Sequence, residues 1–285
     1  MKRDLDVVLS QYNGYCFGVK RAMKLIEEGL DVRGGRIFSL GDVIHNPQAV
    51  ERLRDMGVLR AQSLEEIERG DNLIIRAHGV GPDVLEEARR RGIELIDTTC
   101  PFVMKSHNHV RRMAEEGRKV IIIGDGRHPE VQGIAGRAGR KPVIIRTVEE
   151  AERLGGIGRA GVVIQTTFSR EKASRIIDAL RGNVKDLEVN ETICQATMLR
   201  RDSTRRLAGS VDMILVVGGR NSSNTRELYQ MCVDEGIPSR FIETADEIDP
   251  GWFEGLSRIG IATGTSTPDW VIDSVLEKLE DCDRR

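Results

Sequence analysis

The chain has 285 residues, which is enough for one large domain or for two to three small domains with hydrophobic cores. Lys and Arg number 43 against 45 Asp and Glu, and this near-zero net charge argues against a nucleic-acid-binding protein, because such proteins normally carry a basic surplus. No apolar run is long enough for a signal peptide or a membrane span, so we expect a cytoplasmic protein.

The first predicted elements alternate between strands and helices. The run DVVLSQ predicts a strand before Cys16, and FGVKRAMKLIEEGL after it has the periodicity of a helix. RIFSLGDVIHN predicts a strand that ends at a glycine and opens a polar loop with His45, and QAVERLRDMG is the next helix. GVLRAQSLEEI combines a strand with a helix start, and NLIIRAHGVGPDV predicts a strand followed by a polar loop with His78.

This order of elements returns twice further along the chain. The strand-like runs IELIDTTC and LEVNETIC lead into Cys100 and Cys194, which lie 84 and 178 residues after Cys16. The strands that follow, with their polar loops, are KVIIIGDGRHPE and DMILVVGGRNSSN, then PVIIRTVEEAERL and SRFIETADEI, and finally GVVIQTTFSREKA and IGIATGTSTPDWV. Self-similarity at a period of roughly ninety residues indicates three copies of one β/α unit.

We therefore predict an α/β fold of three pseudo-threefold related subdomains with small parallel sheets, since alternating strands and helices form parallel sheets with helices on both faces. The subdomains are predicted at residues 16–99, 100–192 and 193–285. The third copy lacks its last strand, and residues 1–15 are expected to supply it. Because ligands bind beyond the carboxyl ends of parallel strands, the polar loops of the subdomains are expected to converge on one central pocket.

Three cysteines occupy equivalent positions in the three copies, and we interpret Cys16, Cys100 and Cys194 as a metal site. Three thiolates without a fourth protein ligand leave one coordination position open, either on a zinc ion or on one iron of an iron–sulfur cluster. The alternative for a cysteine is a small buried hydrophobic residue. We expect this of Cys232 and Cys282, which have no equivalents in the other copies.

The same loops carry side chains that donate hydrogen bonds to anions. Imidazoles, hydroxyls and amides followed by helix N-termini are typical of phosphate binding, whereas no Walker-type or G-x-G-x-x-G loop follows a strand, so a nucleotide is not expected. The predicted residues are His45, His78, His128, Ser222, Ser223, Asn224 and Ser266, with Thr166 on a neighbouring loop. His107 and His109 are expected at the surface of the helix after Cys100.

Glu130 follows His128 in one of these loops. A carboxylate next to an anionic ligand and away from water tends to have a raised pKa, which would let it serve as a proton donor near neutral pH. The alternative for Glu130 is a salt bridge or a helix cap.

Nine motifs in this order resemble those of the 4-hydroxy-3-methylbut-2-enyl diphosphate reductase family, iron–sulfur enzymes of the non-mevalonate isoprenoid pathway. They are CFGVKRA, VIHNP, RAHGV, DTTCPFV, GRHPEVQG, QTTFS, TICQAT, RNSSNT and TGTSTPD, and they span residues 16–269. The resemblance implies three α/β subdomains around one 4Fe–4S cluster. It also implies that Cys16, Cys100 and Cys194 ligate this cluster and leave one iron open.

The resemblance further implies a reductive dehydroxylation that yields isopentenyl and dimethylallyl diphosphate with two electrons and protons. The diphosphate of the small substrate would lie against the predicted histidines, serines and Asn224. Thr166 would lie near the substrate hydroxyl, and Glu130 would be the proton source. The expected electron donor is a reduced ferredoxin or flavodoxin, or a reductase system fed by NADPH.

Three other functions would use parts of the same site. A zinc-dependent hydrolase of a phosphorylated substrate would contain zinc and no iron or sulfide. A phosphate or redox sensor with a labile cluster would not need Glu130. A cluster-dependent dehydratase would turn over without a reductant.

Overall fold

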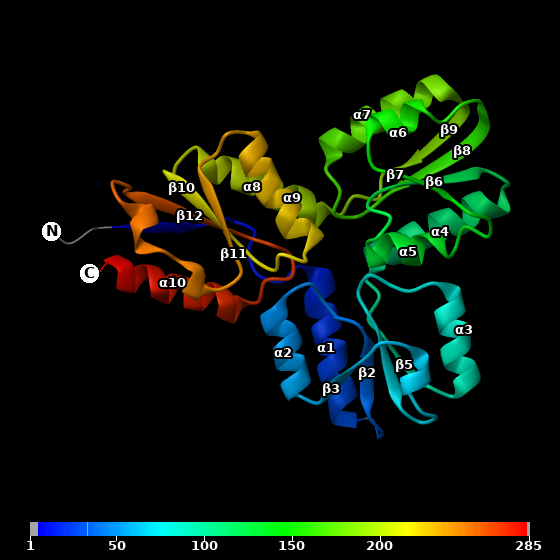
Figure 1. Cartoon of the computed structure of the whole chain (residues 1–285), viewed down its shortest axis with the longest axis horizontal. Helices are drawn as coiled ribbons and strands as arrows, with labels where there is room; N and C mark the ends of the chain where they lie inside the picture. The colour runs from blue at the N-terminus through cyan, green and yellow to red at the C-terminus, as the bar shows by residue number, and fades with distance from the viewer. Residues whose placement is uncertain (1–4, 33, 284–285) are drawn as a thin grey trace. The chain divides into compact units, whose positions relative to one another are not determined.

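A computed structural model of the chain describes residues 5–32 and 34–283 (Figure 1). Within these residues the strands form three four-stranded sheets, all parallel, and helices alternate with strands along the chain. The predicted α/β fold with small parallel sheets is therefore confirmed. The subdomain boundaries stay a prediction, and residues 1–4 and 284–285 of the predicted ranges lie outside the described residues.

The three sheets share one strand order: β3-β2-β4-β5, β7-β6-β8-β9 and β11-β10-β12-β1. The first sheet contains β2 (Ile37–Leu40), β3 (Val58–Ala61), β4 (Asn72–Ile75) and β5 (Glu94–Asp97). The second contains β6 (Lys119–Ile123), β7 (Val143–Ile145), β8 (Ile157–Ile164) and β9 (Val184–Asn190). The third contains β10 (Met213–Val217), β11 (Ser239–Ile242), β12 (Arg258–Thr263) and β1 (Asp6–Leu9). Strand β1 thus pairs beside β12, in the place that β5 and β9 take in the other sheets.

Helices follow the strands in the predicted order. They are α1 (Phe17–Val32), α2 (Pro47–Asp55), α3 (Pro82–Arg91), α4 (Pro101–Glu115), α5 (Pro129–Ala135), α6 (Val148–Glu152), α7 (Arg170–Asn183), α8 (Gln195–Ala208), α9 (Ser223–Asp234) and α10 (Asp269–Asp283). Where α6 follows β7, the other two copies have 3₁₀ turns, Leu64–Glu66 and Ala245–Glu247. In the described ranges, no helix has both the length and the apolar character needed to cross a bilayer.

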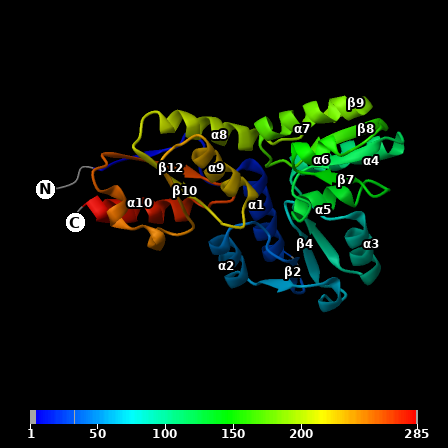
Figure 2. The same ribbon diagram turned by 45° about the horizontal axis from the view of Figure 1, so that its top comes forward.

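The second sheet is buried on both faces. Ile121 and Ile123 of β6 pack with residues of α6 and α7, whereas Val120 and Ile122 pack with residues of α4 and α5. Figures 1 and 2 show these two helix pairs on opposite sides of the strands. A strand that is covered on both faces needs apolar residues at successive positions, which explains the run VIII in the sequence.

The third sheet has the same two-sided core. Leu215 and Val217 of β10 pack with residues of α10, and Ile214 and Val216 pack with residues of α8 and α9. The two cysteines without repeat equivalents belong to these cores: Cys232 to the cluster with α8 and α9, and Cys282 to the cluster with α10. Burial raises the pKa of the Cys232 thiol to about 11, so this residue is an inert core side chain, as predicted.

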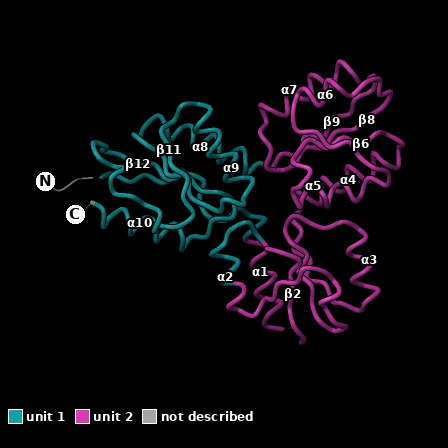
Figure 3. The backbone as a smooth tube through the Cα atoms, viewed as in Figure 1, with its two compact units in different colours: residues 1–19, 44–52, 195–285 teal, residues 20–43, 53–194 magenta. Residues whose placement is uncertain are grey.

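The described residues divide into two compact units (Figure 3). The first unit, made of residues 1–19, 44–52 and 195–285, contains the third sheet. The second unit, made of residues 20–43 and 53–194, contains the first and second sheets. Cys16 therefore belongs to the first unit, and Cys100 and Cys194 belong to the second.

The two-sided core predicts which side-chain truncations lower the free energy of unfolding most. Ile261 in β12 is fully buried between two neighbouring strands, so Ile261→Ala should lower the free energy of unfolding by about 2–5 kcal/mol. Leu59→Ala, in edge strand β3 with 41% of the residue exposed, is the control and should cost less than about 1 kcal/mol. Urea unfolding measures both changes, and equal costs would contradict the assigned burial.

Candidate functional site

The three repeat-equivalent cysteines lie between the carboxyl end of a strand and the start of a helix. Cys16 precedes α1, Cys100 is the N-cap residue of α4, and Cys194 precedes α8. All three are half-buried and outside any disulfide, in contrast with the two core cysteines. The dipole at a helix N-terminus favours the thiolate, which is the form that binds metals. The position and the exposure of these side chains therefore fit ligation of a metal ion or an iron–sulfur cluster.

The backbone N–H of each of these cysteines donates a hydrogen bond to a carbonyl oxygen two residues beyond the end of a neighbouring strand. The three bonds run from Cys16 to Thr265 at 3.0 Å, from Cys100 to Ala77 at 3.0 Å and from Cys194 to Thr166 at 2.8 Å. The accepting residue is Thr166 itself in one copy, and it directly precedes His78 or Ser266 in the others. The fold therefore ties each cysteine to a loop that carries a predicted anion-binding residue.

Glu130 and Thr166 form a buried pair in the second unit. The Thr166 N–H donates to Oε1 of Glu130 at 2.6 Å, and the Thr166 hydroxyl donates to Oε2 at 2.7 Å. Only 2% of Glu130 and 6% of Thr166 is exposed. Burial raises the pKa of the Glu130 carboxyl, and the two hydrogen bonds from Thr166 act in the opposite direction. This environment favours a protonated Glu130 at a higher pH than in water, as a proton donor requires.

His128 begins the same helix as Glu130. It is the N-cap residue of α5, and its Nδ1 accepts the N–H of Glu130 at 3.2 Å. The proton of the neutral imidazole must then be on Nε2, which can donate to an anion. The ring of His78 packs edge-on against that of His128, with 5.4 Å between the ring centroids. The loops after β4 and β6 thus bring together two of the predicted anion-binding imidazoles.

The start of α9 gathers polar residues in the first unit. Ser222 is the N-cap residue and accepts the Thr225 N–H at 3.2 Å, and Ser223 is the first residue of the helix. The side-chain oxygen of Asn224 accepts the Thr265 N–H at 2.9 Å. Since the Thr265 carbonyl accepts the N–H of Cys16, the single residue Thr265 links the cysteine to the predicted anion-binding amide.

His45 and Ser266 meet in the same unit. The Ser266 hydroxyl donates to the backbone carbonyl of His45 at 3.1 Å. A Cβ atom on Gly219, just beyond β10, would collide with the same carbonyl oxygen, so a glycine is needed for this close approach. The loops after β2, β10 and β12 are therefore packed together in the first unit.

The predicted site residues thus form two groups. His78, His128, Glu130 and Thr166 belong to the second unit, and His45, Ser222, Ser223, Asn224 and Ser266 belong to the first. Their convergence on one central pocket stays a prediction, and so do their individual roles.

Arg200 is a buried residue that the sequence analysis did not assign to the site. Only 3% of the residue is exposed, and its guanidinium donates to Oγ1 of Thr263 at 2.8 Å. The same group donates to the backbone carbonyls of Tyr12, Asn13, Gly14 and Thr263. Burial lowers the pKa of Arg200 to about 10, and interaction with Cys16 opposes this effect. Arg200 therefore fixes the loop before Cys16 and places a positive charge near its thiol.

The prediction that His107 lies at the surface is wrong, because only 5% of this residue is exposed. The loop after β4 covers it at Gly79, which has φ of +69° and where a Cβ atom would lie 2.5 Å from Cε1 of His107. Burial lowers the pKa of His107 to about 3, and the charge of Arg137 adds to this effect, so the ring is neutral. His109 is half-buried. The signal for this contact in the sequence is the glycine after His78, which allows a close backbone approach.

The chain matches a known family over nearly its whole length. The family model described as LytB protein matches residues 7–280. Curated proteins named 4-hydroxy-3-methylbut-2-enyl diphosphate reductase from Geobacter sp. (strain M21) and from Aquifex aeolicus (strain VF5) are each 40% identical over 280 residues. The alignments cover 98% of this chain and 99% of the Geobacter protein, and 97% of this chain and 96% of the Aquifex protein.

Two solved structures share the fold. One is described as (E)-4-hydroxy-3-methyl-but-2-enyl diphosphate reductase, the terminal enzyme of the non-mevalonate pathway, and is 39% identical with a TM-score of 0.72. The alignment covers 97% of this chain and 99% of that one. The other is the E-1-hydroxy-2-methyl-but-2-enyl-4-diphosphate reductase from Plasmodium falciparum, which is 27% identical with a TM-score of 0.91 over 96% of this chain and 87% of that one.

The buried carboxyl group predicts a pH-dependent stability. An acid whose pKa is raised on folding above its unfolded value of about 4.3 costs stability as the pH rises above that value. Glu130→Gln removes this cost. The difference in melting temperature between the variant and the wild type should therefore shift in favour of the variant between pH 5 and pH 8.

Glu27→Gln, on the exposed side of α1, is the matched control, because it removes the same charge without burial. Scanning fluorimetry at both pH values measures the two differences. A shift that favours the wild type as the pH rises would contradict a raised pKa of Glu130.

Proposed function

Because the chain belongs to the LytB protein family, we propose that it is an oxidoreductase that reduces 4-hydroxy-3-methylbut-2-enyl diphosphate, the activity that the names of its relatives state. The proposed products are isopentenyl and dimethylallyl diphosphate. Replacing the allylic C–O bond by C–H consumes two electrons and two protons and releases one water molecule. The observation that carries the proposal is the equivalent placement of Cys16, Cys100 and Cys194, each bonded to a loop with a candidate substrate-binding residue.

The proposed cofactor is one 4Fe–4S cluster held by these three cysteines. When bound, the cluster supplies the two electrons and one iron with an open coordination position. Arg200 supports the ligand loop, because its guanidinium fixes the carbonyls just before Cys16.

The diphosphate is proposed to bind to neutral hydrogen-bond donors. His78 and His128 supply imidazole N–H groups, and the N-termini of α5 and α9 supply backbone N–H groups and a favourable dipole. The donors of the first unit are His45, Ser222, Ser223, Asn224 and Ser266.

Glu130 is proposed as the proton source for the departing hydroxyl group. Burial holds its proton at a higher pH than usual, and the Thr166 hydroxyl lies 2.7 Å from Oε2. A proton can therefore pass from the carboxyl group of Glu130 through the hydroxyl of Thr166 to the substrate oxygen, which leaves as water. Thr166 also holds Cys194 through its carbonyl, so one residue sets the positions of both the proton donor and a ligand thiol.

The proposed electron donor is a reduced ferredoxin or flavodoxin, or a reductase system fed by NADPH. A cytoplasmic location agrees with this proposal, because three ligand thiols must remain reduced.

Metal content tests the cofactor. Anaerobically reconstituted protein should contain about four iron and four sulfide per chain, the composition of a 4Fe–4S cluster. Cys100→Ser should lower both, since serine lacks the soft thiolate ligand, whereas Cys232→Ser changes a core cysteine and should leave the iron-to-sulfide ratio of the folded protein intact. One zinc per chain without iron or sulfide would instead support a hydrolase.

Turnover tests the proton source. Glu130→Gln should lower reductive turnover by about 10²–10⁴-fold, the usual contribution of a general acid, with the iron and sulfide content unchanged. Thr166→Ser keeps the hydroxyl that bonds to Glu130 and should retain most activity, whereas Thr166→Val should lose it. Product formation is measured with dithionite and a mediator. Turnover without any reductant would indicate a dehydratase, and full activity of Glu130→Gln would exclude this residue as the acid.

A further inference from the structure

A large basic pocket lies in the second unit, away from the candidate site. Its volume is about 980 Å³, and seven of its thirteen lining residues are Lys or Arg, whereas one, Glu115, is acidic. The walls come from the end of α4, the turn into β6, the segment between α5 and β7, and the first half of β8. In a chain with a net charge of −2, this concentration of positive charge is a local feature.

The pocket lies at the opposite edge of the second sheet from the candidate site. Lys119 is the first residue of β6 and lines the pocket, whereas the loop with His128 follows the other end of that strand. In β8, Arg159 lines the pocket, and Thr166 follows the carboxyl end. Arg159 and Ile164, the last residue of β8, are five residues apart along the extended strand, about 17 Å, and Thr166 lies two residues further on. A ligand in the pocket would therefore not occupy the proposed substrate site.

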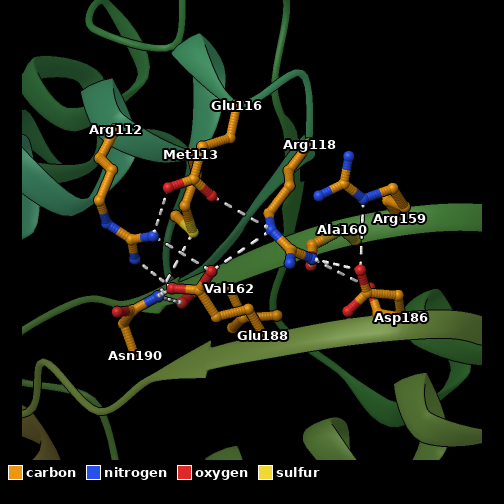
Figure 4. Close-up of polar contacts among 10 residues, drawn as sticks. All are labelled: Arg112, Met113, Glu116, Arg118, Arg159, Ala160, Val162, Asp186, Glu188 and Asn190. Carbon is orange, nitrogen blue, oxygen red and sulfur yellow. Dashed lines mark hydrogen bonds and ion pairs between the residues drawn. The ribbon is translucent and has the colours of Figure 1, made fainter.

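One wall of the pocket is a neutral ion-pair network, which Figure 4 shows. Arg118 and Arg159 both contact Oδ2 of Asp186, at 3.0 and 3.3 Å. Arg118 also contacts Glu188 at 3.3 Å, and Glu188 pairs with Arg112. Glu116 pairs with both Arg112 and Arg118, so three arginines meet three carboxylates. The charges of these groups compensate one another, so this wall adds little to the excess of positive charge in the pocket. The ion pairs also hold the two pocket-lining arginines, Arg118 and Arg159, in place.

The excess comes from five cations without an ion pair in the described part of the chain. They are Arg111, Lys119, Arg137, Arg140 and Lys141, and they face the single carboxylate of Glu115. The ammonium group of Lys119 donates to the backbone carbonyl of Lys141 at 3.1 Å, and the guanidinium of Arg111 donates to the amide oxygen of Asn108, also at 3.1 Å. The pocket thus holds four more positive charges than negative ones outside the paired wall.

Arg137 is the most buried of these five. Its guanidinium donates only to backbone carbonyls, those of Val80 and Gly133. Burial lowers the pKa of Arg137, whereas the negative charge of Asp97, and to a smaller extent that of Asp83, opposes this effect; the like charge of Arg111 adds to it. Asp97 and Asp83, which do not line the pocket, thus compensate part of the charge of Arg137, and the uncompensated charge of the pocket lies on the exposed cations.

We propose that this pocket binds a small organic polyanion with a di- or triphosphate group. The shape favours a small ligand, because a concave site close to 1,000 Å³ is at the upper end of small-molecule pockets. The residue types favour phosphate, because Arg binds phosphate oxygens in a bidentate manner and Lys binds them as a point charge. Apart from Arg137, four unpaired cations line the pocket against the carboxylate of Glu115, and this excess of positive charge suits a di- or triphosphate.

Inorganic tripolyphosphate is the probe that tests this proposal. Isothermal titration of the reconstituted full chain at low ionic strength should show binding that weakens as salt is added. Arg140→Ser/Lys141→Ser removes two exposed cations without ion pairs and should weaken binding about tenfold or more. Arg111→Ser, on the exposed face of α4, should also weaken the binding of tripolyphosphate. Because Arg111 lies on a different element, this variant shows whether the effect of the double substitution is due only to a local change in the segment before β7.

The matched control is Arg175→Ser/Lys185→Ser, which removes an exposed Arg and Lys of the same unit outside the pocket and should leave the affinity unchanged. Ser222→Ala/Ser266→Ala alters the proposed diphosphate site and should also leave the pocket affinity unchanged. Binding that is lost in this last variant and retained in Arg140→Ser/Lys141→Ser would place the anion in the substrate site and overturn the proposal. If Arg175→Ser/Lys185→Ser weakened the binding as much as Arg140→Ser/Lys141→Ser does, the binding would be a nonspecific effect of positive charge and the proposal would be overturned.

Discussion

The bond between each ligand-type cysteine and the loop of a neighbouring strand is the constraint on which the candidate site depends. A peptide N–H and a carbonyl oxygen fix the backbone of Cys16, Cys100 and Cys194 to a position two residues beyond β12, β4 and β8. Because the three sheets share one strand order, the same bond recurs in each. The backbone thus fixes the position of each cysteine relative to the neighbouring loop, and the side chains of both remain available to bind a cofactor or a substrate.

The buried polar groups of the two units have complementary roles. In the second unit, the carboxyl group of Glu130 accepts two hydrogen bonds from a single threonine. These bonds fix the position of the carboxyl group but, unlike a cation, do not neutralise its charge. In the first unit, Arg200 is surrounded by carbonyl oxygens and keeps its positive charge. Burial without an ion pair leaves each group responsive to a ligand, whereas a salt bridge would hold it in one charge state.

The repeat made the sheets and the cysteine positions predictable from the sequence. Strand–loop–helix order is local, and three copies reinforced each weak pattern. The burial of Arg200 and His107 could not be predicted, because both residues lie in helices. The sequence of a helix does not specify which distant loop will cover one of its faces. His107 is buried by a loop that starts 29 residues earlier, at His78, and Arg200 by residues nearly 190 positions away. Such contacts depend on packing between repeats, which periodicity within a repeat does not contain.

The first unit is assembled from three separate stretches of chain, and within the described residues β1 pairs with β12 alone, near the other end. A nascent chain can complete residues 20–194, with Cys100 and Cys194 already bonded to their loops, while residues 195–285 are still being synthesised. Cys16 obtains its partner, Thr265, only when almost the whole chain exists. Cys16, which is synthesised first, is therefore the last of the three cysteines to reach its final backbone geometry. Premature termination of translation would leave the Cys16 N–H without the Thr265 carbonyl.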